Sequence, residues 1–167
     1  PGHLRQLITT SIELSELTDG YYNPAIGKLI NLWQFHRYQE EGIAPPEATA
    51  IEALVQSAPS MQDVTIEGDM LSSSNPDVLL NFGAYAKGYA IELGLNKLKA
   101  MGIDNAIINA GGDLGTIGRH GERPWNIGIR HPRRDTMLAS IEVGDDESVF
   151  TSGDYERYYL HDDRRYH

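Results

Sequence analysis

The stretch AYAKGYAIELGLNKLKAMG, residues 84–102, decides the fold. Apolar side chains such as Ile91 and Leu95 recur at helical spacing, and Gly102 stands where a left-handed residue ends a helix. The sequence therefore predicts a long helix over Ala84–Met101. Beyond it the pattern changes to short apolar or alternating runs, which are typical of strands. Without a repeating strand–helix alternation, this order favours an α+β fold with a mostly antiparallel sheet in the second half.

The first half of the chain is predicted to be mainly helical. Helices are expected over His3–Leu17, from Pro24 to Trp33, and over Pro46–Ala58, with a polar loop over His36–Pro46 between the last two. A proline can begin a helix because its missing N–H would find no partner there.

Short strands complete the prediction. They are expected over Val64–Ile66, Met70–Leu71, Val78–Leu80, Ala106–Asn109, Leu114–Arg119, Trp125–Ile129, Met137–Val143, Val149–Thr151 and Tyr155–Leu160. Gly68–Asp69 is read as a turn between two of them. The last strand is expected to pair with Arg164 onward through a turn at Asp162–Asp163.

Composition excludes several classes of protein. The chain has 167 residues, which suits one domain, with 14 Lys or Arg against 24 Asp or Glu and a net charge of −10. Such acidity disfavours nonspecific binding to nucleic acid. No cysteine is present, which excludes disulfides, thiolate metal sites and a cysteine nucleophile. The chain begins without Met, and we interpret it as one domain that is incomplete at both ends.

The segment Asn81–Ala90 is a candidate anion site. A short apolar run enters a glycine turn that opens the long helix, and the start of a helix offers unpaired N–H groups and a partial positive charge. Lys87 in the first turn is unfavourable for the helix alone but suits a bound anion. The alternative interpretation is a solvated lysine beside an ordinary turn.

Two further segments suit either a ligand or a turn. Adjacent glycines in Gly111–Asp113 let another backbone or a ligand approach closely, or simply connect two strands. Thr151–Asp154 combines two hydroxyls with a glycine and a carboxylate. No nucleophile-elbow motif surrounds Ser152, so hydrogen bonding to a ligand or a turn is favoured over nucleophilic attack.

Aromatic, histidine and arginine residues leave further alternatives open. Tyr21 and Tyr22 lie beside a glycine turn, where they could stack on a flat ring or seal a small core. The histidines lack the spacing of a zinc site. The basic stretch Arg130–Arg134 is read as a charged loop with a possible ligand role.

In combination, these segments resemble the ApbE family of flavin transferases. The matching pieces are TDGYYNPAIGKLINLWQF (18–35), NFGAYAKGYAIE (81–92), NAGGDLGTIGR (109–119), PWNIGIRHP (124–132), TSGDYERYY (151–159) and RYH (165–167). They run in the family's order and cover nearly all of the chain from Leu14. At Asn81 the family commonly has Asp.

The resemblance implies a function and a set of residues. Such proteins bind FAD with Mg²⁺ and move its FMN half onto a Thr or Ser hydroxyl of a target protein, releasing AMP. The positions that match FAD contacts in the family are Tyr21, Tyr22, Asn23, Asn81 and Lys87. Ala84 matches a residue whose backbone carbonyl holds the metal. The catalytic histidine is expected at His167 or just beyond, with the other metal ligands further on.

The resemblance also suggests a bacterial periplasm or the outer face of the inner membrane, with a lipid anchor in an earlier segment. Three alternatives stay open. The protein could hydrolyse FAD to FMN and AMP, bind flavin without catalysis, or be a structural domain without a ligand.

Overall fold

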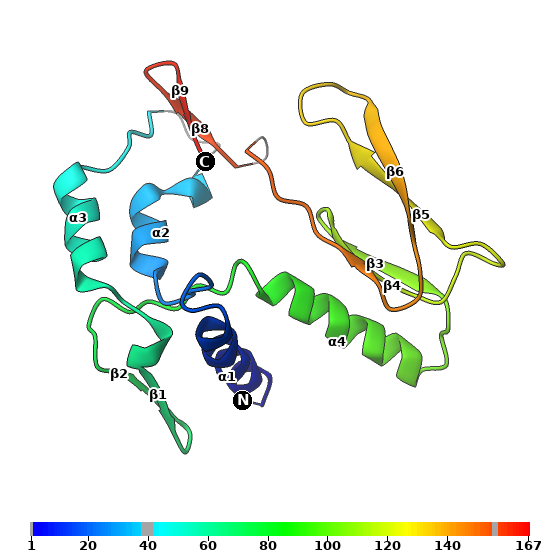
Figure 1. Cartoon of the computed structure of the whole chain (residues 1–167), viewed down its shortest axis with the longest axis horizontal. Coiled ribbons are helices and arrows are strands. Elements are labelled where there is room, and N and C mark those ends of the chain that lie inside the picture. The colour runs from blue at the N-terminus through cyan, green and yellow to red at the C-terminus, as the bar shows by residue number, and fades with distance from the viewer. Residues whose placement is uncertain (1, 38–41, 155–156) are drawn as a thin grey trace. The chain divides into compact units, whose positions relative to one another are not determined.

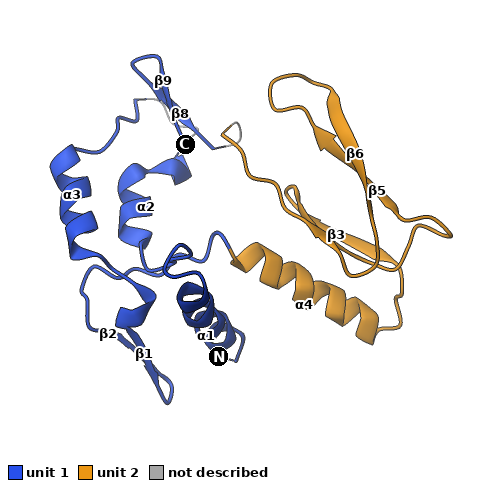
Figure 2. Cartoon of the chain, viewed as in Figure 1, with its two compact units in different colours: residues 1–84, 157–167 blue, residues 85–156 orange. Residues whose placement is uncertain are grey.

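The computed structural model describes residues 2–37, 42–154 and 157–167, and it divides into two compact units. Unit 1 comprises residues 1–84 and 157–167, and unit 2 comprises residues 85–156, as Figure 2 shows. Unit 2 is therefore inserted into the sequence of unit 1. That residues 1–167 form a single incomplete domain stays a prediction.

Unit 1 contains most of the helices and two small hairpins (Figure 1). Its elements in chain order are α1 (Gly2–Leu17), α2 (Gly27–Trp33), the 3₁₀ turn η1 (Phe35–Arg37), α3 (Ala48–Ser57), the 3₁₀ turn η2 (Met61–Asp63), β1 (Val64–Glu67), β2 (Met70–Ser73), β8 (Tyr159–His161) and β9 (Arg164–Tyr166). The pairs β1–β2 and β8–β9 are each antiparallel.

Unit 2 is one helix with two small antiparallel sheets. Its elements are α4 (Ala86–Ala100), β3 (Ala106–Ala110), β4 (Asp113–Ile117), β5 (Trp125–Arg130), β6 (Met137–Val143) and β7 (Ser148–Val149). One sheet has the order β3-β4-β7, and β5 and β6 form a separate hairpin. The predicted α+β class, with helices mostly in the first half, is confirmed.

The predicted start of the second helix at Pro24 is wrong. The N–H of Leu79 donates to Ala25 O at 3.1 Å, and the N–H of Gly27 donates to Leu79 O at 2.8 Å, so the backbone of residues 25–27 pairs with Leu79 and α2 begins only at Gly27. A Cβ added to Gly27 would lie 2.3 Å from Leu79 O, so any side chain at this position would clash with the backbone of Leu79. The predicted strand Val78–Leu80 is reduced to this single parallel bridge between Ile26 and Leu79.

The other predicted helices are present: α1 begins one residue earlier than predicted, and α3 and α4 begin two residues later. The expected start at Pro46 is wrong because Glu47 is extended, with ψ 137°, and α3 begins at Ala48. The expected start at Ala84 is wrong because Gly83–Tyr85 form a turn before α4. Gly102, with φ +78°, follows α4 as predicted, and the N–H of Ile103 donates to Leu98 O at 3.1 Å in the usual left-handed helix ending.

Two-residue turns lie where the sequence predicts them. Gly111 and Gly112 both have positive φ and join β3 to β4, with Ala110 opposite Asp113. Asp162 and Asp163 also have positive φ and join β8 to β9. Part of the predicted strand Tyr155–Leu160 falls on residues 155–156, outside the described residues.

Each unit has its own small core. In unit 1, Ile8, Ala25, Met61 and Val64 are buried together. In unit 2, Ile91 and Leu95 of α4 pack with Ile117 on the β3–β4 pair. Each fully buried large apolar side chain stabilises a fold by roughly 1.5–3 kcal/mol. The predicted helical spacing of Ile91 and Leu95 therefore does place one face of α4 against the sheet.

Four aromatic rings fix the C-terminal hairpin within unit 1. Tyr159 of β8 lies 5.4 Å from Tyr166 of β9 and 5.7 Å from Phe35, centroid to centroid. Trp33 closes the ring of contacts at 5.8 Å from Phe35 and 6.2 Å from Tyr166. We call these four residues the aromatic quartet. Tyr159 is buried and the other three rings are half-buried, so the quartet packs together within unit 1.

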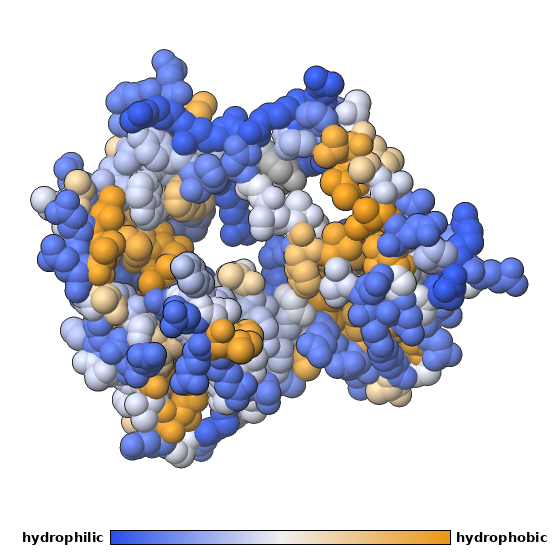
Figure 3. Space-filling view, viewed as in Figure 1, coloured by the Kyte–Doolittle hydropathy of each residue, from blue (hydrophilic) through white to orange (hydrophobic). Residues whose placement is uncertain are grey.

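Exposed large apolar side chains lie on both units, and some of them are on β6 of unit 2. Met137 and Leu138 of β6 are 68% and 60% exposed. Figure 3 shows apolar surface in the region where Figure 1 places β5 and β6. None of the helices within residues 2–37, 42–154 and 157–167 has the length and apolar composition that crossing a membrane requires.

Candidate functional site

Three of the segments singled out in the sequence meet in unit 2. The first turn of α4 supplies Lys87, the turn after β3 supplies Gly112, and the residues after β7 supply Thr151. Asp113, the first residue of β4, contacts all three segments, either directly or through its neighbour Gly112. We call Lys87, Gly112, Asp113 and Thr151 the Asp113 cluster.

The carboxylate of Asp113 uses its two oxygens for two different elements. Oδ2 forms an ion pair with Lys87 Nζ, and Oδ1 accepts a hydrogen bond from the N–H of Thr151 at 3.2 Å. The hydrogen bond from Lys87 lowers the pKa of Asp113 below its ordinary value, burial acts to raise it, and the Thr151 N–H lowers it further. The carboxylate is therefore held in its charged form although Asp113 is only 8% exposed.

The glycine turn and Thr151 are hydrogen-bonded to each other next to Asp113. The hydroxyl of Thr151 donates to Gly112 O at 3.4 Å, and the N–H of Gly112 donates to Asn109 Oδ1 at 2.9 Å. The two positive φ angles of the turn bring these carbonyl and amide groups close to the strand that follows. The structure supports the reading in which the glycines connect two strands, because both have positive φ and a Cβ added to either would meet no atom within 4 Å.

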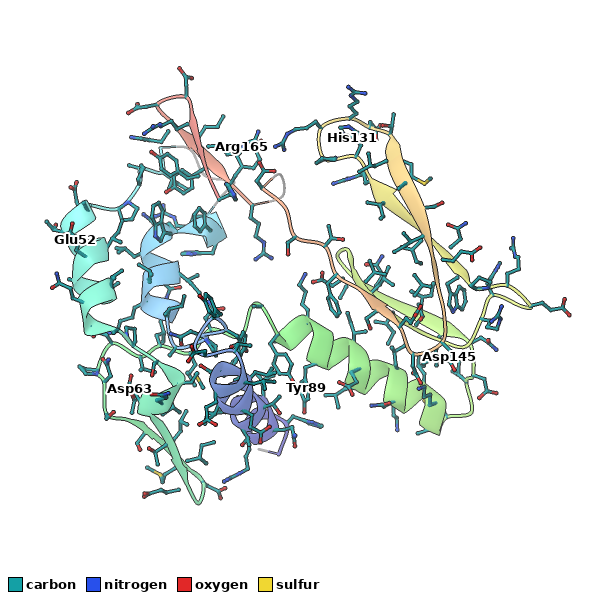
Figure 4. All side chains as sticks on the ribbon, viewed as in Figure 1. Glu52, Asp63, Tyr89, His131, Asp145 and Arg165 are labelled. Carbon is teal, nitrogen blue, oxygen red and sulfur yellow. The ribbon has the colours of Figure 1, made fainter. Side chains whose placement is uncertain are left out.

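An arginine of the basic stretch extends this network. Arg133 donates from Nη2 to Asp154 Oδ2 at 2.8 Å, and its own N–H donates to Nδ1 of His131 at 3.0 Å. Figure 4 labels His131 in the loop that joins β5 to β6. The charged loop is therefore linked to the segment Thr151–Asp154 by one ion pair.

The predicted aromatic turn lies in unit 1, where its residues differ in exposure. Tyr21 is 95% exposed, so its ring is accessible. The hydroxyl of Tyr22 is hydrogen-bonded to Ser11 Oγ at 3.1 Å. Asn23 donates from Nδ2 to Pro59 O at 2.8 Å and accepts the N–H of Ala25 at 3.1 Å. Tyr22 and Asn23 thus stabilise unit 1, and a contact of all three with FAD stays a prediction.

Asn81 links two of the predicted segments within unit 1. Its N–H donates to Pro24 O at 2.8 Å, next to the aromatic turn. Its side-chain Oδ1 accepts the N–H of Gly83 at 2.9 Å and so shapes the turn before α4. An aspartate could accept the same bond, which explains how Asn can stand where the family commonly has Asp. Ala84 is exposed in that turn.

The residues present do not by themselves make a magnesium site. No group of three His, Asp or Glu side chains comes together within the ranges that the structure describes. Asp113 has its oxygens engaged by Lys87 and Thr151, and Ala84 offers only a backbone carbonyl. His167 lies exposed after β9. Metal binding at Ala84 and catalysis by a histidine at or beyond His167 therefore stay predictions.

Sequence reasoning missed Asp113 as a site residue. The signal was available: a carboxylate directly follows two glycines and opens the buried stretch Leu114–Ile117. A charged group at the edge of a buried strand needs a partner. Lys87 was the candidate partner for this carboxylate, because a lysine in the first turn of the predicted helix is unfavourable for the helix alone.

Comparison with known proteins finds one matching family and several similar proteins. The sequence profile of the ApbE family matches residues 1–167. The FAD:protein FMN transferase of Rhodobacter capsulatus is 40% identical over 163 residues, which cover 95% of this chain and 30% of that protein. The FAD:protein FMN transferase of a Vibrio cholerae strain is 31% identical over 165 residues, 96% of this chain and 48% of that protein.

Solved structures show the same fold. An ApbE protein from Thermotoga maritima matches 100% of this chain and 54% of its own with a TM-score of 0.85 and 32% identity. The apo form of the flavinyl transferase ApbE from Pseudomonas stutzeri matches 100% of this chain and 51% of its own, with a TM-score of 0.77 and 33% identity. The chain thus spans about half the length of these solved relatives.

Proposed function

The chain belongs to the ApbE family, and on that premise we propose that the full-length protein transfers FMN from FAD to a hydroxyl of a target protein and releases AMP. The observation that supports this most is the Asp113 cluster, because it joins three of the segments that carry the family resemblance. The curated relatives with at least 30% identity are FAD:protein FMN transferases.

The reaction is a transfer between two oxygens. A Thr or Ser hydroxyl oxygen of the target forms a bond to the phosphorus of the FMN half, and the bond from that phosphorus to the bridging oxygen breaks. AMP leaves with the electron pair, and a base accepts the hydroxyl proton. We assign the base to a histidine at or just beyond His167.

Charge is the main contribution that this part of the protein can make. A diphosphate brought to an acidic protein needs local positive charge. We assign this role to Lys87 and the N–H groups of the first turn of α4, because both lie at the same end of one helix. Mg²⁺ would neutralise further charge when bound, and we derive no step from it.

A direct assay tests the proposal. Full-length protein is incubated with FAD, MgCl₂ and a peptide from an acceptor protein that contains one threonine, with a matched peptide in which valine replaces the threonine. The expected result is a mass gain equal to FMN on the threonine peptide alone, with one AMP released per transfer. Free FMN plus AMP without a modified peptide would instead indicate FAD hydrolysis. Intact FAD bound to the protein would indicate a flavin-binding module.

We also propose that the protein acts in the bacterial periplasm or at the outer face of the inner membrane, held by a lipid anchor. The proposal rests on the family resemblance alone. Fractionation of cells that express the full-length protein from its native start tests it, with recovery in the cytoplasmic fraction as the contradicting result.

A further inference from the structure

The environment of Asp113 differs from that of an ordinary surface carboxylate. Its side chain is 11% exposed, whereas the side chain of its partner Lys87 is 48% exposed. A buried charge is costly unless it is paired and hydrogen-bonded, and here each oxygen has a partner from a different element. Asp113 is thus the fixed member of the pair, and Lys87 is the member that solvent or a ligand can reach.

Lys87 can still donate hydrogen bonds to a ligand while it is paired with Asp113. An ammonium has three donor hydrogens, and the ion pair with one carboxylate oxygen uses one of them. The other two can meet an oxyanion that approaches from the exposed side. Without Asp113, the four-carbon side chain of Lys87 would sample many rotamers, and orienting it on a ligand would cost conformational entropy.

We propose that Asp113 is a positioning residue, whose carboxylate fixes the Lys87 ammonium and the backbone at Thr151 at one point so that the diphosphate of FAD meets an oriented cation. This inference rests on the proposed function. Asp113 itself does not touch the substrate. Its role is to act through Lys87.

A second ion pair on the same helix provides the matched control. Lys99, in the last turn of α4, pairs with Asp146, and these side chains are 41% and 65% exposed. This pair likewise joins α4 to a residue after a strand, but its carboxylate lies open to solvent. Asp146→Asn therefore removes a comparable bond from a place where no substrate is expected.

Kinetics of the full-length protein test the role. Asp113→Asn keeps an oxygen that can accept the Thr151 N–H but removes the charge that holds Lys87. We expect kcat for FMN transfer to fall at least tenfold while KM for FAD changes less than threefold, because the cation stays present but loses its orientation. Asp146→Asn should match the wild type. A kcat for Asp113→Asn within threefold of wild type would overturn the inference. So would a rise in KM without a fall in kcat.

A chemical readout tests the pair without turnover. An ammonium must lose a proton before its nitrogen can attack an acylating reagent, and a carboxylate that accepts its hydrogen bond opposes that loss. We expect acetic anhydride to modify Lys87 several-fold faster in Asp113→Asn than in wild type, as followed by peptide mass spectrometry, while Lys97 reacts equally in both. Equal rates at Lys87 would overturn the inference. If wild type shows the slow Lys87 but transfers no FMN, the proposed function fails and the pairing stands.

Discussion

The ammonium of Lys87, near the start of α4, lies against the carboxylate of Asp113, the first residue of β4. The two residues are separated by the whole of α4 and β3, so the packing of the helix on the strands brings them together. Lys87 was a candidate from the sequence, whereas Asp113 emerges only from this packing.

Replacement of Lys87 by alanine should weaken FAD binding. A hydrogen bond to a charged group contributes about 1.5–3 kcal/mol, so we expect Kd to rise roughly 10- to 100-fold. The protein should stay folded at 25 °C with a melting temperature a few degrees lower, because Asp113 keeps the Thr151 bond but loses its cation. Titration calorimetry and thermal denaturation measure both effects. Lys97→Ala, in the last turn of the same helix, is the control. Unchanged affinity in Lys87→Ala would show that the phosphates bind elsewhere.

The stability supplied by Asp113 should depend on pH. Since folding lowers the pKa of Asp113 from its ordinary value of 3.8, its contribution is fully present above that pH and is lost as pH falls through the lower folded-state pKa. Asp113→Asn should therefore melt below wild type at pH 7, and the difference should shrink as the pH falls to 3. Asp146→Asn, in an exposed pair, should differ little from wild type at either pH. A difference for Asp113→Asn that grows on acidification would contradict the prediction.

Gly27→Ala should destabilise unit 1. The added Cβ would lie 2.3 Å from the backbone oxygen of Leu79, and a backbone atom cannot move aside as a side-chain end can. Forced displacement in a packed site costs about 1–3 kcal/mol. Urea denaturation followed by circular dichroism measures it. Gly2→Ala, with open space around the new methyl group, should leave the midpoint unchanged. A tolerated Gly27→Ala would mean that the contact between residues 25–27 and Leu79 is not needed.

The hydroxyl of Tyr159 should be dispensable. It is buried and has no hydrogen-bond partner among the described residues, while desolvation raises its pKa. Removing a polar group that lacks a partner relieves a desolvation cost, so Tyr159→Phe should leave stability unchanged or raise it by up to about 1 kcal/mol. Tyr22→Phe, which loses the bond to Ser11, should instead lose about 1 kcal/mol. The urea denaturation midpoints of the two variants measure these effects. A strongly destabilised Tyr159→Phe would refute the prediction that the Tyr159 hydroxyl is dispensable.

Local sequence signals predict much of this fold. The apolar spacing in α4, Gly102 at its end and the two-residue turns all rest on conformations that a few neighbouring residues determine. The start of α2 could not be predicted in the same way. Pro24 permits a helix, but the backbone of Ala25 and Gly27 pairs with Leu79, more than fifty residues away. A tertiary hydrogen bond overrides local propensity there.

The candidate site likewise combines features that the local sequence predicts with features that depend on tertiary packing. The sequence singles out Lys87, the glycine turn and Thr151–Asp154 as separate segments, and the reasons are local: a helix start, adjacent glycines and a set of hydroxyls. Their meeting point at Asp113 depends on which strands pair, and the sequence shows no spacing that reveals it. The histidine and the metal ligands implied by the family resemblance depend on residues that do not come together in the described ranges.

The aromatic quartet has a consequence for synthesis on the ribosome. Trp33 and Phe35 precede unit 2 in the chain, whereas Tyr159 and Tyr166, the rings that pack on them, follow it. Unit 2, which lies between them in the chain, can complete its core first. During translation Trp33 and Phe35 therefore lack these partner rings until residues 159–166, which follow unit 2, have been synthesised.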